Sequence, residues 1–548
     1  MVLLFFRMAE VHKIPHSTTE TIFSDFKTVV KNILFNFATE IKRKTHQEGD
    51  GTSQEIDTLQ NCDFIEEVFE CTSNKYQREK YAKENMPYVR PQQLSLEDGG
   101  NFQYIPVINV LRNLMMSEYF CAHLSDFAAD QNEGTHFYDF RDGLLLKNKI
   151  SDLLQGGSQF TLFFLIYTDE VEIANPLGPK RGQHKLIVVY LSVLNIHAKY
   201  RSQLSSIFVA VVAKYKYVQR HGLARIMKQL VDDLRVLADV GFTVQHSGNT
   251  VRVRGFVVAC CGDNLSLNKL GGFNTSFSKG HSCRWCLVSM EDIQAVFHEK
   301  NVQHRTMDMH MSHVAAALSD SNLSKRLYGV GEQSLLLGIH YFDLSLQLPP
   351  DLMHDVLEGA IPHVLREVLN GLISDSVISF SDLDRVATFN YGHHEKKQKP
   401  EPLTRHFVQG QTGYKGTASQ KWCLFYVFPL VFAELIPEGN EHWEIYLQLR
   451  GIVEIIFADE LLKDYLAYLQ DEIRLFLSAF SAMYPGKMIP KMHFLLHYPR
   501  VISELGPLKQ YWCMRFEAKH QYIKMIATPE LQKYLLLSSS EAPALAEH

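Results

Sequence analysis

The feature that most constrains the fold of this chain is a series of short, β-rich apolar segments around one amphipathic helix. Residues 159–168, 185–194 and 205–213 are apolar runs rich in the residue types that favour strands. Residues 222–241, GLARIMKQLVDDLRVLADVG, carry apolar side chains at helical spacing. Two more strand-like segments, TVQHSG and NTVRVRGFVVACC, follow around a turn. The sequence therefore predicts a mixed α/β core.

Three acidic residues stand in distinctive settings that are far apart in the sequence. Asp169 ends the apolar run QFTLFFLIYTDE, and Asp263 ends the run VRGFVVACCGD. Glu517 lies in YWCMRFEAKHQYIKMI, a segment of helical character. Two strand-end aspartates and one helix glutamate are how an RNase H-like core gathers three carboxylates around two divalent cations. Three strands, a helix and a strand ending in an aspartate is also that core's element order, so we expect an RNase H-like catalytic core.

The three carboxylates suit Mg²⁺ (or Mn²⁺). Two such ions, roughly 3.5–4 Å apart, clamp the attacking and leaving oxygens of a phosphodiester. Mg²⁺ prefers oxygen ligands, usually one or two carboxylates with water and phosphate. On spacing alone the alternatives stay open, because a strand-end aspartate is usually a turn or cap residue and a helix glutamate is usually solvated. Glu170 and Glu172 also compete with Asp169 for its role.

A second group of residues has the spacing of metal ligands. Cys283-Arg-Trp-Cys286 is a CxxC pair, a frequent half-site for tetrahedral zinc. His493 and His497 in KMHFLLHYP are spaced i, i+4 and share one face if that segment is helical. A structural zinc that joins the two half-sites would hold Glu517 near the aspartates. The alternatives are a redox dithiol and ordinary core or surface histidines.

The segment PPDLMHDVLEGAIPHVL carries Asp351 and His354 at helical spacing after two prolines that suit a helix start. Asp351 could be a helix cap. His354 is a lone histidine on a half-apolar helix, which is more often a satisfied core residue than a ligand.

The loop NPLGPKRGQHK follows the first aspartate and puts Lys180, Arg181 and Lys185 just beyond it. Lys and Arg neutralise phosphates in proteins that bind DNA, so these three residues are candidate DNA contacts. The alternative is a solvated hairpin tip.

Composition sets limits on the class of protein. The net charge is −6, so any DNA contact rests on local basic patches. Nine scattered cysteines do not resemble a secreted disulfide framework, which favours an intracellular location. No stretch approaches the roughly 18 apolar residues of a membrane span, so we expect a soluble protein without a membrane partner.

Pattern changes along the chain predict its domains. Residues 1–155 read as a mainly helical N-terminal region, and 156–300 as the first part of the core. Residues 301–500 read as a large helical insertion, 501–532 as the final core helix with the glutamate, and 533–548 as a flexible tail.

Together these segments resemble animal transposon-derived proteins related to the CACTA (En/Spm-type) DDE transposases. The resemblance is carried by YTDEVEIANPLGPKRGQHK, VVACCGDNLSLNKLGGFNTSFSKGHSCRWC, PPDLMHDVLEG and WCMRFEAKH, and covers roughly residues 156–530. It implies an RNase H-like core with a large insertion. Residue by residue, it implies that Asp169, Asp263 and Glu517 are the metal-binding acids. It implies that Cys283 and Cys286 are the family's CxxC pair, and that Asp351 and His354 form its D-x-x-H signature.

A more distant similarity concerns the zinc residues. The order of Cys pair, His pair and glutamate is similar to that of the V(D)J recombinase catalytic subunit, where such residues hold structural zinc. This similarity favours pairing Cys283 and Cys286 with His493 and His497.

The expected function is a nuclear DDE transposase-like protein that cleaves and transfers DNA strands with Mg²⁺ (or Mn²⁺). His354 is expected to help position a DNA end. DNA is the expected partner, and a homodimer is possible because two DNA ends are normally joined together. The rival hypothesis is a domesticated, non-catalytic scaffold that binds DNA or protein.

A third hypothesis is a hydrolase or other zinc enzyme that uses Cys283, Cys286 and a histidine. G-x-S-x-G, H-E-x-x-H and Walker A motifs are absent. Residues 1–155 also contain no zinc finger or helix-turn-helix pattern for recognising transposon ends. We therefore expect either a truncated copy or a host gene that kept the fold.

Overall fold

The computed structural model describes residues 1–6, 8, 16–45, 57, 61, 63–86, 88–124, 134–150, 160–173, 184–246, 248–393 and 395–526. The chain divides into two compact units. The first comprises residues 1–93, 105–117 and 521–548, and the second comprises 94–104 and 118–520. The described residues 94–104, 118–124 and 134–150 thus belong to the second unit.

The first unit is helical. Its helices are α1 (Val2–Phe6), α2 (His16–Thr45), α4 (Asp63–Glu70), α5 (Lys75–Asn85) and α6 (Val107–Met115). A small aromatic core forms where α1, α2 and α4 meet, around Phe5, Phe23, Ile65 and Phe69. Arg78 lies over the Phe5 ring at 4.2 Å.

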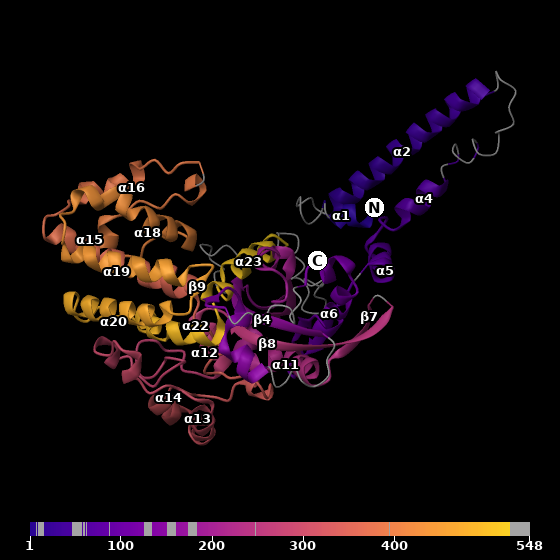
Figure 1. The fold of residues 1–548 in the computed structure, drawn as a ribbon. Helices are drawn as coiled ribbons and strands as arrows, with labels where there is room; N and C mark the ends of the chain where they lie inside the picture. The colour runs from indigo at the N-terminus through magenta and orange to yellow at the C-terminus, as the bar shows by residue number, and fades with distance from the viewer. Residues whose placement is uncertain are drawn as a thin grey trace. The chain divides into compact units, whose positions relative to one another are not determined.

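The second unit is built on a seven-stranded sheet with the order β1-β2-β6-β5-β4-β8-β7, which confirms the predicted mixed α/β class (Figure 1). The strands are β1 (Gln92–Ser95), β2 (Asn101–Tyr104), β4 (Phe160–Glu172), β5 (Lys185–Val193), β6 (Ile207–Lys214), β7 (Phe242–His246) and β8 (Asn249–Cys261). β4 and β8 run parallel. The pairs β4–β5, β5–β6, β2–β6 and β7–β8 are antiparallel.

The central strands and their helix lie where the apolar pattern predicted them. β4 reads as a nearly continuous apolar run, and its residues 162–168 are all buried. Helix α11 (Leu223–Asp239) follows α10 (Tyr215–His221) and buries one face, including Leu230 and Leu234. Hydrogen bonds tie α11 to the sheet: the Tyr104 hydroxyl donates to Asp233 at 2.5 Å, and the Arg254 guanidinium donates to the Ala238 carbonyl.

The hairpin β1–β2 was missed, because residues 1–155 were predicted to be mainly helical. Its turn carries Asp98, Gly99 and Gly100, and Gly99 has a φ of 79° that favours glycine. β2 extends the core sheet by pairing with β6, with Gln103 opposite Val212.

The predicted insertion, 301–500, is mainly helical in the described residues. Its longer helices are α13 (Met307–Ser319), α14 (Ser321–Tyr328), α15 (Ile361–Ser374), α18 (Ala418–Phe432), α19 (Glu441–Ile456) and α20 (Tyr465–Met483). Figure 1 shows α15, α18, α19 and α20 gathered together in orange and yellow, and α20 also packs on α22 (Tyr498–Leu505). None of the described helices is long and apolar enough to cross a membrane.

Candidate functional site

Asp169 and Asp263 lie at the same edge of the sheet. The parallel pairing of β4 with β8 ends with Tyr167 opposite Cys261. Each aspartate follows its paired residue by two positions, so the two parallel strands deliver both carboxylates to one place. Asp169 was expected to end its strand, but β4 continues to Glu172 because its pairing with β5 extends beyond the pairing with β8.

The ionisation of Asp169 reflects its acidic neighbours. Burial, followed by the negative charge of Asp263, raises the pKa of Asp169 to about 7, and the charge of Glu517 adds to the shift. Hydrogen bonds donated by the Glu170 N–H at 2.6 Å and the Tyr167 hydroxyl at 2.9 Å act in the opposite direction. The structure therefore brings all three predicted acids within electrostatic range, and such perturbed carboxyls cluster at functional sites.

Asp263 is also a helix cap. Its carboxylate accepts a hydrogen bond from the Ser266 N–H at 2.6 Å and starts α12 (Asn264–Gly271). The cap interaction involves one oxygen, Oδ1, and fixes the side chain at the sheet edge. The cap role and a ligand role are compatible, because a carboxylate offers two oxygens.

Glu517 lies in the first turn of α23 (Met514–Ile526). Its neighbour Phe516 stacks on Tyr167 of β4, with ring centroids 4.6 Å apart and an interplanar angle of 7°. This contact fixes the start of α23 against the strand that carries Asp169. The Glu517 side chain stays 36% exposed, so it is accessible to a ligand.

The three acids do not form a compact group of potential ligand atoms. Among the described residues, three groups have potential ligand atoms that all lie within 4.8 Å of one another, and Asp169, Asp263 and Glu517 are not one of them.

The D-x-x-H motif links the insertion to Glu517. His354 Nδ1 lies 2.5 Å from Asp351 Oδ2, and His354 Nε2 lies 3.1 Å from Glu517 Oε1. Burial lowers the pKa of His354, but the two carboxylates outweigh it and raise the pKa to about 11. His354 is thus an imidazolium that joins two acids. The motif opens η8 (Met353–Ala360), a π-helical segment, and such segments are frequent at functional sites.

Cys283, Cys286, His493 and His497 form a buried group that could hold a metal ion, as the sequence predicted. All four ligand atoms lie within 4.8 Å of one another. Cys283 Sγ lies 3.4 Å from His497 Nε2, and Cys286 Sγ lies 3.3 Å from His493 Nε2. The histidines share a face because α21 (Pro490–Phe494) continues into the turn Leu495–His497. Two thiols and two imidazoles match a closed tetrahedral site.

The surroundings of this group suit a metal. Burial opposes ionisation of Cys283, but hydrogen bonds with Cys286 and the histidines lower the pKa of its thiol well below the usual range, whereas burial and the nearby Cys283 raise the pKa of Cys286 well above it. The coupled pair therefore favours one thiolate, the form that binds metals. Glu299 Oε1 lies 3.1 Å from His497 Nδ1 and accepts from Arg500 Nε at 3.1 Å. A carboxylate on the remote imidazole nitrogen fixes which nitrogen faces the metal. No sequence signal identified Glu299.

Of the three predicted DNA contacts, Lys180 and Arg181 lie outside the described residues. Lys185 forms an ion pair with Glu170. Lys269 of α12, which sequence reasoning missed, also pairs with Glu170 at 2.9 Å. Burial opposes ionisation of Glu170, but the two lysines lower its pKa, so it is an ion-paired carboxylate rather than a rival to Asp169.

His520 was also missed. Its Nδ1 lies 3.7 Å from Asp169 Oδ2, and its ring stacks on Tyr190 with centroids 5.6 Å apart. It follows Glu517 by three residues, so both side chains lie on one face of α23. The spacing E-x-x-H in FEAKH was the available signal.

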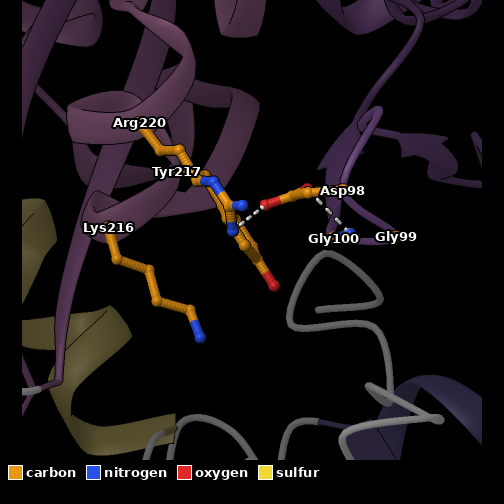
Figure 2. A pocket seen from close by; sticks show the side chains of 6 residues that line it. All are labelled: Asp98, Gly99, Gly100, Lys216, Tyr217 and Arg220. Atoms are coloured by element: carbon orange, nitrogen blue, oxygen red, sulfur yellow. Dashed lines mark hydrogen bonds and ion pairs between the residues drawn. The ribbon is translucent and has the colours of Figure 1, made fainter.

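A surface pocket lies elsewhere in the second unit (Figure 2). It has a volume of about 430 Å³ and lies between the β1–β2 turn and α10. Asp98 pairs with Arg220 at 2.7 Å and accepts from the Gly100 N–H at 3.1 Å, while Lys216 and Tyr217 complete the lining. None of the predicted site residues lines it.

Comparison with known proteins gives no family assignment. No protein-family model matches the chain, and no curated protein matches it. The geometry and chemistry of the site are therefore the basis for its proposed function.

Proposed function

We propose that this protein is a DDE transposase-like enzyme that cleaves and transfers DNA strands with Mg²⁺ (or Mn²⁺). The observation that carries the proposal is the position of Asp169 and Asp263, each two residues beyond the last paired residues of two adjacent parallel strands, with Glu517 close enough to add to the raised pKa of Asp169. The negative charges of three acids, from two adjacent strands and one helix, repel one another. A divalent cation relieves that repulsion, so the donor set fits such ions.

The order of the elements supports an RNase H-like core as the framework of this site. Three strands, β4, β5 and β6, precede helix α11, and β8 then returns parallel to β4. Asp169 and Asp263 come from the two parallel strands, and Glu517 comes from the last described helix, α23. This is the arrangement that the resemblance to CACTA-type transposases implies.

Asp169, Asp263 and Glu517 would hold the cations, and Lys185 would contact the DNA backbone. Two such ions, when bound, stabilise the attacking and leaving oxygens of a phosphodiester displacement. The protein itself fixes the three carboxylates, through the cap at Asp263 and the stacking of Phe516 beside Glu517. Preorganised groups of this kind avoid reorganisation during the reaction.

In this proposal the Cys/His group holds structural zinc. Four protein ligands fill a tetrahedral site, whereas a catalytic zinc keeps one position open. A zinc hydrolase is therefore a weaker hypothesis than a structural zinc site. The ligand pairs are 207 and 214 residues apart in sequence, so the metal would join the two ends of the insertion.

DNA as partner, a nuclear location and a homodimer belong to the same proposal. The second candidate is a non-catalytic scaffold derived from a transposase. The ligand atoms of the three acids do not all lie within 4.8 Å of one another, and a scaffold, unlike an enzyme, requires no shared ion.

Nicking of supercoiled plasmid by the full chain, with Mg²⁺ or Mn²⁺, separates the two candidates. Asp263→Asn is the informative variant, because asparagine caps helices as well as aspartate does but carries no charge. Asp320→Asn is the matched control, since Asp320 caps α14 by the same kind of bond, to the Leu323 N–H at 3.0 Å.

The enzyme hypothesis expects metal-dependent nicking by the wild type and by Asp320→Asn, and its loss in Asp263→Asn. Nicking that survives in Asp263→Asn would point to a contaminating nuclease. Absence of nicking in all three proteins would favour the scaffold.

A further inference from the structure

We propose that Asp351 and His354 form a positioning unit that holds Glu517 in place for its ligand role. The inference rests on the proposed function, and it replaces the sequence-based expectation that His354 contacts a DNA end. The proposal gives neither residue a ligand role of its own, although Asp351, His354 and Cys513 also place potential metal-binding atoms within 4.8 Å of one another. They are positioning residues, because they act through Glu517.

The unit has a buried anchor. The Asp351 side chain is 4% exposed and accepts hydrogen bonds from two directions. From its own segment it accepts the N–H groups of Met353 at 3.3 Å and His354 at 3.2 Å, as a helix cap does. From the far end of the core it accepts the Cys513 N–H at 2.9 Å. Asp351 therefore joins the start of η8 to the residue that precedes α23.

The anchor controls where α23 begins. The Glu517 N–H donates to the Cys513 carbonyl at 3.0 Å, which is the first turn of that helix. Asp351 thus fixes the backbone of Glu517 through Cys513, and it fixes the carboxylate of Glu517 through His354. Two independent connections from one buried carboxylate leave Glu517 little freedom.

His354 has the geometry of an orienting group. One ring nitrogen is held by Asp351, so the other nitrogen is aimed at Glu517 Oε1 at 3.1 Å. Glu517 keeps a second oxygen for a cation. Partners that hydrogen-bond to a metal's carboxylate ligands orient those ligands, and their loss typically weakens metal binding by roughly 10–100-fold.

Two substitutions at His354 distinguish a loss of Glu517 orientation from a loss of folding. Asparagine at 354 places an amide near the Nδ1 position and keeps the bond to Asp351, but it cannot reach Glu517. Glutamine places its amide near the Nε2 position and keeps a donor toward Glu517. The measurement is Mn²⁺ affinity of the full chain by electron paramagnetic resonance, with thermal unfolding as the folding control.

We expect His354→Asn to bind Mn²⁺ roughly 10-fold or more weakly, and His354→Gln to recover most of the loss. In a Glu517→Gln background, His354→Asn should cause no further loss, because the residue acts through Glu517. Equal affinity of wild type and His354→Asn, or additive losses in the double variant, would overturn the positioning role.

If His354→Asn does not fold, His354→Leu, which also removes the donor toward Glu517, takes its place: a tenfold loss that His354→Gln does not show supports the role, and equal affinity of His354→Leu and wild type contradicts it. Failure of the proposed function looks different. In that case the wild-type chain itself binds no Mn²⁺ that depends on Asp263.

Discussion

Replacing Asp169 by asparagine should make the free energy of unfolding of the metal-free protein less dependent on pH. Its pKa rises from 3.8 to about 7 on folding, because of burial and the charges of Asp263 and Glu517. At about 1.4 kcal/mol per pH unit, this shift corresponds to about 4 kcal/mol. Between pH 4 and 7 the folded state binds more protons than the unfolded state, so stability falls as pH rises through this window and stays low above it.

The assay compares melting temperatures of wild type and Asp169→Asn from pH 4 to 8 without added divalent ion. The second unit has about 400 residues. With an unfolding entropy of about 2 cal/mol/K per residue, 4 kcal/mol corresponds to about 5 °C. The melting temperature of the variant, relative to that of the wild type, should therefore rise by up to about 5 °C between pH 4 and pH 8.

Asparagine keeps an acceptor for the Glu170 N–H. Any difference in packing between the two proteins is the same at pH 4 and at pH 8, so it cancels when their melting temperatures are compared across pH. Added Mn²⁺ should stabilise the wild type at pH 8 and leave the variant nearly unchanged. Melting temperatures of the two proteins that run parallel from pH 4 to 8 would refute the electrostatic reasoning.

Three further predictions concern other parts of the molecule. If the Cys/His group holds zinc as proposed, Cys286→Ser should bind no zinc and melt earlier, whereas Cys423→Ser, at a buried thiol outside the group, should keep it. Mass spectrometry of the intact proteins measures the zinc, and thermal unfolding measures the stability. Leu230→Ala should cost about 2–5 kcal/mol in denaturant unfolding, because the side chain is fully buried on α11. Lys269→Met removes one of two partners from the partly exposed Glu170, so it should cost less than about 1 kcal/mol by the same measurement.

The parts of the fold that the sequence predicted are those with a local signal. β4 and β5 are buried apolar runs, and α11 has strong helical periodicity, so each element is marked within its own residues. The Cys/His group was also predictable, because CxxC and i, i+4 histidines are local half-sites. The hairpin β1–β2 is short and mostly polar, and its turn glycines were the only clue.

The parts that could not be predicted depend on contacts between distant residues. Lys269 and Glu170 are 99 residues apart in sequence, and Cys513 lies 162 residues beyond its acceptor Asp351. No spacing rule connects such positions. The extension of β4 past Asp169 has the same origin, since it depends on which neighbouring strand continues to pair.

The most direct test of the central claim is a crystal structure of the full chain soaked with Mn²⁺, with anomalous difference maps to locate the ions. We expect Mn²⁺ bound by Asp169, Asp263 and Glu517, with Glu517 still held by His354. Strong anomalous peaks elsewhere in the ordered chain, with none at these three carboxylates, would contradict it.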